Sequence, residues 1–124
     1  MDKSVSNEPR VVVCLDDLAR WYIQRTNRFP KNWRRTLGDK IDDLVLRMVA
    51  MVHRACLRRN KVDLLEQLSE DLEILRVYTR LAVELECVEG RQYEYVSRQI
   101  DEIGRQLGGW TNSNKEDGGV PVNP

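Results

Sequence analysis

The chain contains a long interval with very little proline or glycine, and this interval constrains the fold more than any other feature. Its prolines stand at positions 9, 30, 121 and 124, so residues 31–120 contain none, and glycine is absent from 39–89. Proline and glycine are the two residues that disfavour a helix interior most strongly. The interval therefore permits helix almost everywhere, and we expect an all-α protein.

Three short breaks divide the chain into four segments that we expect to be helices. The breaks lie at residues 29–32, 58–61 and 88–90. Links this short join antiparallel neighbours in helical proteins. The 124 residues are also the size of one ordinary domain. The sequence therefore predicts a single antiparallel four-helix bundle.

The first two segments each carry apolar residues at helical spacing. The first segment, about 11–27, is predicted to be helical, although Val11, Val12 and Val13 alone are typical of a strand. Its stripe contains Leu15, Leu18, Ala19, Tyr22 and Ile23. The stripe of the second segment is broad, roughly 160° at 100° per residue. It contains Leu37, Ile41, Leu44, Val45, Met48, Val49, Val52, Ala55 and Cys56.

The third segment, about 61–87, has apolar residues on two sides. One side carries Leu65, Leu68, Leu72, Leu75 and Ala82. The nearly opposite side carries Ile74, Val77 and Leu81. Two apolar sides indicate burial on two faces. We infer that the second face packs against another subunit, and the alternative is that Val77 and Leu81 pack under the N-terminal arm.

The fourth segment, about 91–107, is an amphipathic helix with Val96, Ile100, Ile103 and Leu107 on its apolar face. We expect it to end at Gly108 and Gly109, since glycines commonly follow a helix end. The predicted organisation is a flexible arm over 1–10, the bundle domain over 11–110 and a flexible tail over 111–124.

The net charge of zero hides a segregation of charge along the chain. Residues 20–61 contain 12 basic and 3 acidic residues, whereas residues 62–107 contain 5 basic and 11 acidic ones. Fifteen of the 20 cations are arginines, which bind phosphate in bidentate fashion and stack on unpaired bases. Any anionic partner is therefore expected to bind the basic half.

Five basic residues are predicted to form a ridge along one side of the second helix, about 30 Å long at 1.5 Å per residue. They are Lys40, Arg47, Arg54, Arg58 and Lys61. Such a ridge can track a phosphate backbone. The alternative is that it pairs with Asp71, Glu84 or Glu86 of the acidic third helix, as flanking charges do along bundle seams.

A second basic group surrounds the first break. It consists of Arg25, Arg28, Lys31, Arg34 and Arg35, beside Trp21, Phe29 and Trp33. Basic residues among aromatic ones can hold single-stranded nucleic acid, and the aromatic residues can equally seal the end of the core.

The third segment carries two arginines, Arg76 and Arg80, four residues apart. At this spacing like charges repel mildly unless an anion bridges them. Glu73 and Glu84 can relieve the repulsion, and the alternative to an anion-binding role is an exposed salt-bridge ladder.

Most classes of enzyme are disfavoured by the residue inventory. His53 is the single histidine, and the cysteines Cys14, Cys56 and Cys87 are widely spaced, without a Cys-x-x-Cys pair. We expect these cysteines to pack as small hydrophobic residues, and His53 to sit at the edge of the core with a partner. No glycine-rich phosphate loop or nucleophile elbow occurs in the chain.

The chain contains acidic pairs with the spacing that one class of hydrolase requires. All-α metal-dependent pyrophosphatases need two such pairs at i and i+3, and the chain has Asp39 with Asp42 and Glu70 with Glu73. These carboxylates lie away from the main apolar stripes, so we expect them to face solvent. We predict no enzyme activity, no catalytic residues, no metal and no cofactor. No apolar run approaches the length of a membrane span and no signal peptide is seen, so we expect a cytoplasmic protein without membrane contact.

The order of several short motifs resembles a known family. The motifs are Phe29-Pro30, residues 36–41 (TLGDKI), Leu75-Arg76 with Arg80-Leu81-Ala82, and residues 101–110 (DEIGRQLGGW). The chain resembles the accessory variability determinant (Avd) proteins of diversity-generating retroelements over about 15–110. A wider class of small four-helix-bundle proteins, which includes those encoded in ribosomal RNA intervening sequences, shares the bundle.

The resemblance implies a homopentameric barrel of four-helix bundles without catalytic activity. It implies partners: a reverse transcriptase and its template RNA, or DNA, in a complex that makes mutagenic cDNA for retrohoming into a target gene. Arg76 and Arg80 match the paired arginines of the family's third helix and are implied to contact the reverse transcriptase or nucleic acid. Gly104 is implied to let two helices approach closely. The alternative is a structural bundle of the intervening-sequence type, without a retroelement role.

Overall fold

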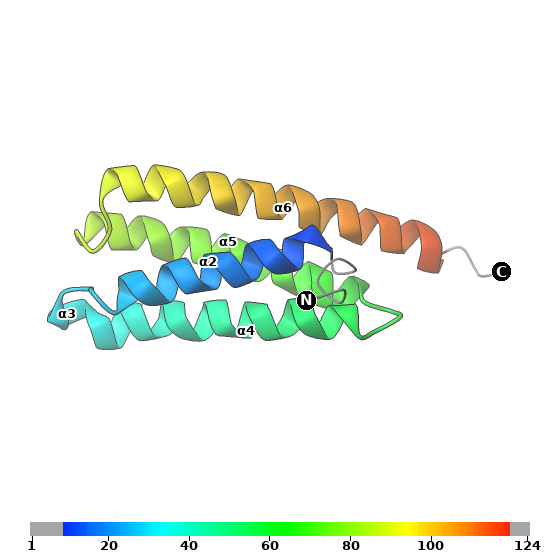
Figure 1. The fold of residues 1–124 in the computed structure, drawn as a ribbon, viewed down its shortest axis with the longest axis horizontal. Helices are drawn as coiled ribbons and strands as arrows, with labels where there is room; N and C mark the ends of the chain where they lie inside the picture. Colours follow the sequence, from blue (N-terminus) through cyan, green and yellow to red (C-terminus); the bar gives the residue numbers. More distant parts are fainter. Residues whose placement is uncertain (1–8, 120–124) are drawn as a thin grey trace, which may run out of the picture.

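The computed structural model describes residues 9–119, with side chains described for residues 9–115. Four long helices and a short helical connection make up this part of the chain (Figure 1). The elements are α2 (Arg10–Thr26), α3 (Lys31–Trp33), the π-helix η1 (Arg34–Gly38), α4 (Asp39–Cys56), α5 (Val62–Glu84) and α6 (Gly90–Gly119). The three predicted breaks fall between these helices, so the predicted bundle of four antiparallel helices is confirmed.

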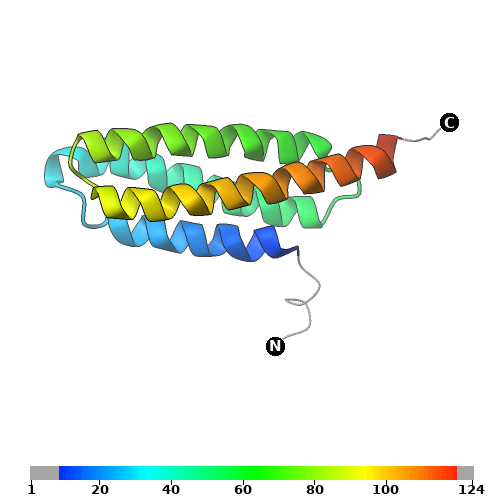
Figure 2. The ribbon, with the colours of Figure 1, turned by 90° about the horizontal axis from the view of Figure 1, so that it is seen from above.

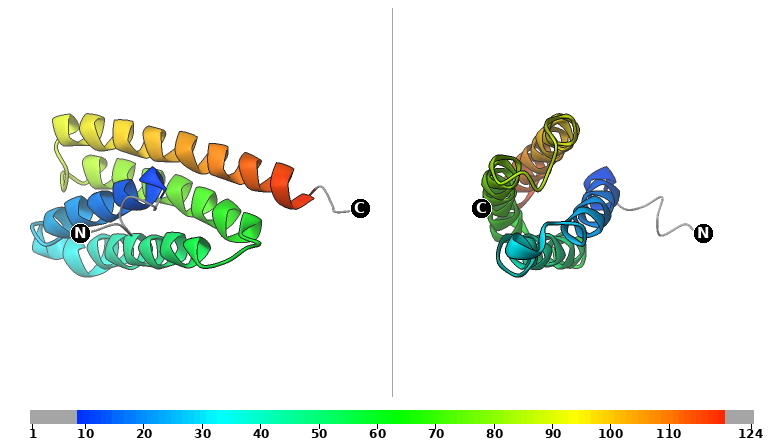
Figure 3. Two further views of the ribbon diagram at one scale, coloured as in Figure 1. Left: turned by 45° about the vertical axis from the view of Figure 1, so that its right-hand side comes forward. Right: turned by 90° about the vertical axis from the view of Figure 1, so that its left-hand side faces the viewer.

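The four long helices surround one core in the order α2, α4, α5, α6. The view along the bundle in Figure 3 shows α2 and α5 at diagonal positions, and α4 and α6 likewise. Contacts between α2 and α4, α4 and α5, and α5 and α6 are extensive, whereas the seam between α2 and α6 is the loosest of the four. The structure thus has one open side, between its first and last long helices.

The core contains the apolar faces that the sequence predicts for α5 and α6 in full. All five residues of the main α5 stripe and all four of the α6 stripe are buried. The triplet Val11, Val12 and Val13 is helical, and the first two of these valines are buried. Helical context therefore overrides the strand preference of three consecutive valines.

A few side chains at the edges of the predicted stripes differ from expectation. Ile23 and Cys56 are exposed, because each lies at the margin of its helix's buried face near the C-terminal end of that helix. Met51, which was not assigned to the stripe of α4, is buried. Cys14 and Cys87 are half-buried and pack against the core as expected.

The second apolar face of α5 is not covered by the described part of the chain. Ile74, Val77 and Leu81 are 45%, 37% and 39% exposed, and Leu85 continues their row. Residues 1–8, on which the alternative packing under the N-terminal arm depends, lie outside the described residues. The single chain therefore leaves a row of apolar side chains on the outer side of α5.

Helix α6 continues past the two glycines at which the sequence predicts its end. Figure 2 shows its C-terminal part reaching beyond the other helices, and Gly108 and Gly109 lie in the helix interior. Thr111 is buried and Lys115 Nζ lies 3.3 Å from Glu66 Oε2 of α5. These contacts outweigh the low helix propensity of glycine. Residues 111–119 of the predicted tail are thus helical, and 120–124 lie outside the described part.

Gly104 does not have the expected role of permitting a close helix approach. A β-carbon added at this residue would lie 3.6 Å from Leu72 Cδ2 of α5, which is an ordinary van der Waals contact. The residue faces α5, but the space there accepts an alanine.

A hydrogen bond between two buried side chains connects the diagonal helices α2 and α5. Tyr22 Oη lies 2.6 Å from Thr79 Oγ1, and both residues are 1% exposed. The Thr79 hydroxyl donates its hydrogen to the carbonyl of Leu75, at 2.6 Å, so Tyr22 donates to Thr79. Burial raises the pKa of Tyr22, and the phenol therefore stays protonated as a donor.

Helix α5 ends in a Schellman motif with a glutamate at the position that usually holds glycine. The amide of Cys87 donates to the carbonyl of Ala82 at 2.7 Å, and the amide of Glu86 donates to that of Val83 at 2.9 Å. Glu86 has a φ of 64°, in the left-handed region. This conformation costs a residue with a β-carbon about 1–2 kcal/mol.

We expect the two partners of the buried hydrogen bond to respond unequally to mutation. Tyr22→Phe removes a donor and should lower the free energy of unfolding by about 1 kcal/mol. Thr79→Val leaves the Tyr22 hydroxyl buried without an acceptor and should cost about 2 kcal/mol. The double variant should cost less than the sum, as measured by urea unfolding. Equal and additive losses would contradict the assignment of Tyr22 as the donor.

We also expect Glu86→Gly to stabilise the protein. Glycine adopts the left-handed conformation without strain, and after its larger loss of backbone entropy the net gain should be about 1 kcal/mol. Glu86→Ala is the matched control, because it removes the carboxylate and keeps the β-carbon. A similar gain in both variants would assign the effect to charge instead of backbone strain.

Candidate nucleic-acid interface

One of the lysines and arginines of α4 forms an ion pair within the described chain, and the others do not. Arg47 donates from Nε and Nη2 to the two carboxylate oxygens of Asp71 on α5, at 3.2 and 3.1 Å. The alternative of pairing with the third helix is therefore correct for Arg47. Lys40 and Arg54 are exposed and form no ion pair with any side chain of residues 9–115. Their charges remain available to an external anion.

The predicted ridge along α4 is shorter than expected. The helix ends at Cys56, so Arg58 and Lys61 lie in the link to α5. Arg58 is exposed, whereas the ammonium of Lys61 sits 5.2 Å from the ring centroid of Trp110 on α6. Lys61 therefore closes one end of the bundle. The continuous ridge over all five residues is wrong, because the helix that would align them stops two residues before Arg58.

The first link, which joins α2 to α4, carries exposed basic residues beside aromatic residues that pack at the end of the core. Phe29 is 2% exposed and belongs to the core, as the second interpretation of these aromatic residues proposes. Trp33 is half-buried. The exposed cations of this region, which form no ion pair within the described chain, are Arg28, Lys31, Arg34 and Arg35. Arg34 and Arg35 begin the π-helical turn η1, which the sequence pattern does not reveal.

The arginine pair of α5 is asymmetric. Arg76 donates to Asp101 Oδ1 of α6 at 2.9 Å and to Glu73 Oε1 at 3.3 Å. Burial by itself lowers the pKa of the Arg76 guanidinium. The hydrogen bonds to Asp101 and Glu73 outweigh this effect, so the pKa is raised above its usual value. Arg80 is exposed and has no ion-pair partner among the described side chains. Arg76 thus fastens α5 to α6, and Arg80 points to solvent.

The carboxylates that imitate a pyrophosphatase site are not brought together. Asp42, expected in solvent, is half-buried and accepts a hydrogen bond of 2.5 Å from Thr26 Oγ1. Burial raises the pKa of Asp42, and the bond from Thr26 opposes this rise. In the part of the chain with described side chains, no group of three or more His, Cys, Asp or Glu residues is placed to hold a metal ion.

His53 has the structural partner expected of it. Its Nε2 lies 3.1 and 3.3 Å from the two carboxylate oxygens of Asp16 on α2. This contact joins α4 to α2 at the edge of the core. The single histidine is therefore engaged in a link between helices.

The open seam between α2 and α6 holds an aromatic pair. The ring centroids of Trp21 and Tyr95 lie 6.2 Å apart with their planes inclined by 34°. The guanidinium of Arg25 stacks over Trp21 at 4.6 Å. These residues and Arg91 line a hollow of about 410 Å³. Trp21 and Arg25 were expected near a binding surface from the sequence, whereas Tyr95 and Arg91 were not; their spacing of four residues on α6 is the signal that was available.

Within residues 9–119, no helix is both long enough and apolar enough to cross a lipid bilayer.

Comparison with known proteins supports the resemblance seen in the motifs. None of the curated proteins compared with the chain matches it. A family model described as bAvd-like matches residues 10–114, which include α2, α4, α5 and most of α6. Proteins of this family are non-catalytic accessory factors of diversity-generating retroelements. Since the match covers nearly the whole bundle, the chain belongs to the bAvd-like family of bacterial accessory variability determinants.

Proposed function

We propose that this protein is an oligomeric adaptor that binds the reverse transcriptase of its retroelement together with template RNA. It performs no chemistry of its own, and it supports mutagenic cDNA synthesis by positioning the RNA through phosphate contacts. The observation that carries the proposal is the set of exposed arginines that form no ion pair with the described chain, concentrated in the first link and around the C-terminal end of α4.

Most of the available cations lie on one side of the bundle, and Arg80 of α5 and Arg91 of α6 are exceptions. Helices α2 and α4 are neighbours, as are α5 and α6, so the charge segregation along the sequence becomes a segregation in space (Figure 3). Arg54 and Arg58 mark the basic side at one end of the bundle, and Arg34 and Arg35 mark it at the other end. A polyanion that lies along this side meets arginines whose charge no internal carboxylate neutralises.

The arginine pair of α5 suits a protein contact. Arg76 is held by Asp101 and Glu73, so its side chain has a defined position. Arg80, one turn away, is exposed and has no partner within the described residues. We propose that this turn of α5 contacts the reverse transcriptase, with Arg80 supplying the free charge.

The outer face of α5 is the proposed interface between copies of the chain. Ile74, Val77, Leu81 and Leu85 follow one another at spacings of three and four residues and form one row on the helix. A second copy that covers this row removes an apolar surface from water. Family resemblance favours a ring of five copies.

Binding of a labelled, structured RNA at several salt concentrations tests the adaptor proposal. We expect Arg54→Gln combined with Arg58→Gln to weaken binding and to reduce the slope of log K against log salt by about one for each arginine. Arg47→Gln is the matched control and should have a smaller effect, because Asp71 already engages that guanidinium.

The same assay distinguishes the adaptor from a purely structural bundle. Binding only when the reverse transcriptase is present would transfer the RNA contacts to that partner. The absence of binding both by the protein alone and by the pair would contradict the adaptor proposal and favour a structural bundle.

Light scattering tests the interface on α5. We expect Val77→Glu or Leu81→Glu to lower the particle mass toward the 14.5 kDa of one chain while the helical circular dichroism is retained. Leu57→Glu is the control, because Leu57 is 86% exposed and lies in the link between α4 and α5. An unchanged mass in both α5 variants would remove this face from the interface.

A further inference from the structure

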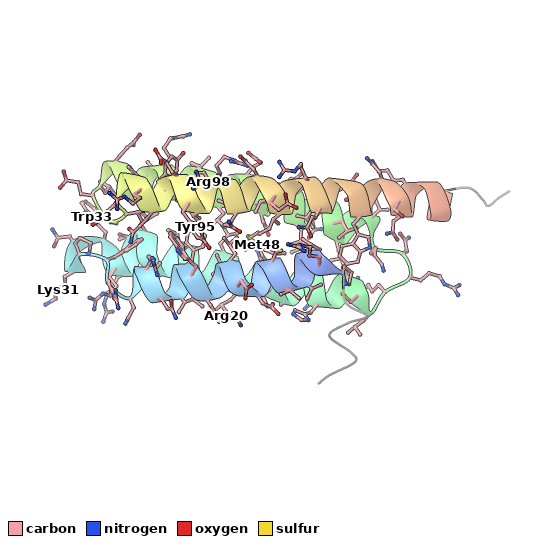
Figure 4. All side chains as sticks on the ribbon, turned by 45° about the horizontal axis from the view of Figure 1, so that its top comes forward. Arg20, Lys31, Trp33, Met48, Tyr95 and Arg98 are labelled. Carbon is pink, nitrogen blue, oxygen red and sulfur yellow. The ribbon has the colours of Figure 1, made fainter. Side chains whose placement is uncertain are left out.

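A groove follows the loose seam between α2 and α6. Two hollows of about 100 and 410 Å³ lie between these helices. A third, of about 450 Å³, lies at the end of the seam and is lined mainly by the end of α5 and its link to α6. Trp21 and Tyr95 line both the first and the second hollow, and Arg25 and Gln92 line both the second and the third. Neighbouring hollows therefore adjoin one another through shared side chains. Figure 4, which looks onto this seam, shows Tyr95 between the two helices.

The middle of the groove presents an aromatic face to solvent. Tyr95 is 46% exposed, although its tilted neighbour Trp21 is half-buried against the core. Trp21 is fixed on two sides, by an edge contact with Tyr22 at 5.0 Å and by the guanidinium of Arg25. A rigid tryptophan beside an exposed tyrosine is the type of surface on which a planar ring stacks.

The charge of the middle hollow is positive. Its lining contains Arg25 and Arg91 and no acidic residue. Neither arginine forms an ion pair with a described side chain, and Arg25 Nε has no hydrogen-bond partner among the described atoms. Carboxylates occur only in the flanking hollows, where Asp17 pairs with Arg20 and where Glu86 and Glu89 line the outer end. An anionic group is therefore best placed in the middle.

The two helices contribute the same combination of residues. Trp21 and Arg25 are four residues apart on α2, and Arg91 and Tyr95 are four residues apart on α6. Such spacing places both residues of a pair on one face of their helix. Each wall of the middle hollow thus carries one aromatic residue and one arginine.

We propose that this groove binds an unpaired segment of RNA, with a base stacked against Tyr95 and Trp21 and the adjoining phosphates on Arg25 and Arg91. The inference rests on the proposed function and narrows it, because it assigns single-stranded RNA to the α2–α6 groove. A duplex does not fit this chemistry, since its bases are already stacked and their faces are hidden. An acidic peptide would use the two arginines and leave the aromatic faces without a partner.

The test compares two oligomers that carry the same number of phosphates. One is a twelve-residue oligouridylate, and the other is an abasic ribose-phosphate chain of the same length. We expect the wild-type protein to bind the oligouridylate more tightly. Tyr95→Ala should weaken that binding by roughly 5- to 100-fold, with an unchanged salt slope, because a stacking contact releases no counterions. Tyr95→Phe keeps the ring and should restore the affinity.

Two further variants separate charge from stacking and this groove from the first link. Arg91→Gln should reduce the salt slope by about one, which Tyr95→Ala does not do. Trp33→Leu removes a half-buried aromatic residue beside the basic first link and should leave oligouridylate binding unchanged. Circular dichroism of each variant establishes that the helices are intact.

The outcomes separate this inference from the proposed function. If the wild-type protein binds neither oligomer nor structured RNA, alone or with reverse transcriptase, the adaptor proposal and the groove proposal fail together. If RNA binds but the two oligomers bind equally, or Tyr95→Ala binds like the wild type, only the groove proposal is overturned. Loss of reverse transcriptase binding in Tyr95→Ala, with oligouridylate binding unchanged, would likewise overturn it and make the groove a protein-binding surface.

Discussion

The hydrogen bond from Tyr22 to Thr79 is the directional constraint between diagonal helices in a core that is held mainly by apolar contacts. Apolar packing tolerates small shifts between helices, whereas a buried hydroxyl pair at 2.6 Å fixes how α2 is rotated and where it stands relative to α5. Because Tyr22 points into the core, its neighbour Trp21, about 100° further around the helix, faces the seam with α6. The position of Trp21 in the groove therefore depends on the hydrogen bond that the adjacent Tyr22 makes in the core.

Internal ion pairs determine which of the many arginines remain available. Arg47 joins the basic helix α4 to the acidic helix α5, and Arg76 joins the two acidic helices α5 and α6. Exposed pairs of this kind contribute little stability, up to about 1 kcal/mol each. Their larger effect is geometric, because they hold α4 against α5 and α5 against α6. The arginines without such partners, Arg54 and Arg80 among them, carry charge that an external ligand can neutralise.

Helical periodicity predicted the bundle because four apolar stripes and three breaks leave little choice of architecture. The main stripes of α5 and α6 are buried as predicted, since each is wide enough to determine which side of its helix faces inward. The end of α6 was not predictable from Gly108 and Gly109, because Thr111 and the Lys115–Glu66 contact belong to tertiary structure. The partner of Arg47 was foreseen, whereas Asp101 was not, because periodicity within one helix does not give its alignment with a neighbour. Tyr95 was missed for the same reason: nothing in α6 alone indicates that Trp21 lies opposite.

A net charge of zero changes how such a protein can bind RNA. A strongly basic protein attracts a polyanion from all sides, and much of its affinity is independent of where the RNA lies. If this chain binds RNA as proposed, the acidic surfaces of α5 and α6 would repel phosphate and direct a strand to the side formed by α2, α4 and the first link. The groove stands at the border of these regions, where Arg91 of the acidic half joins Arg25 of the basic half. With the long-range attraction weak, short-range contacts such as stacking must supply a larger share of the affinity, and they act only on a strand whose bases are unpaired.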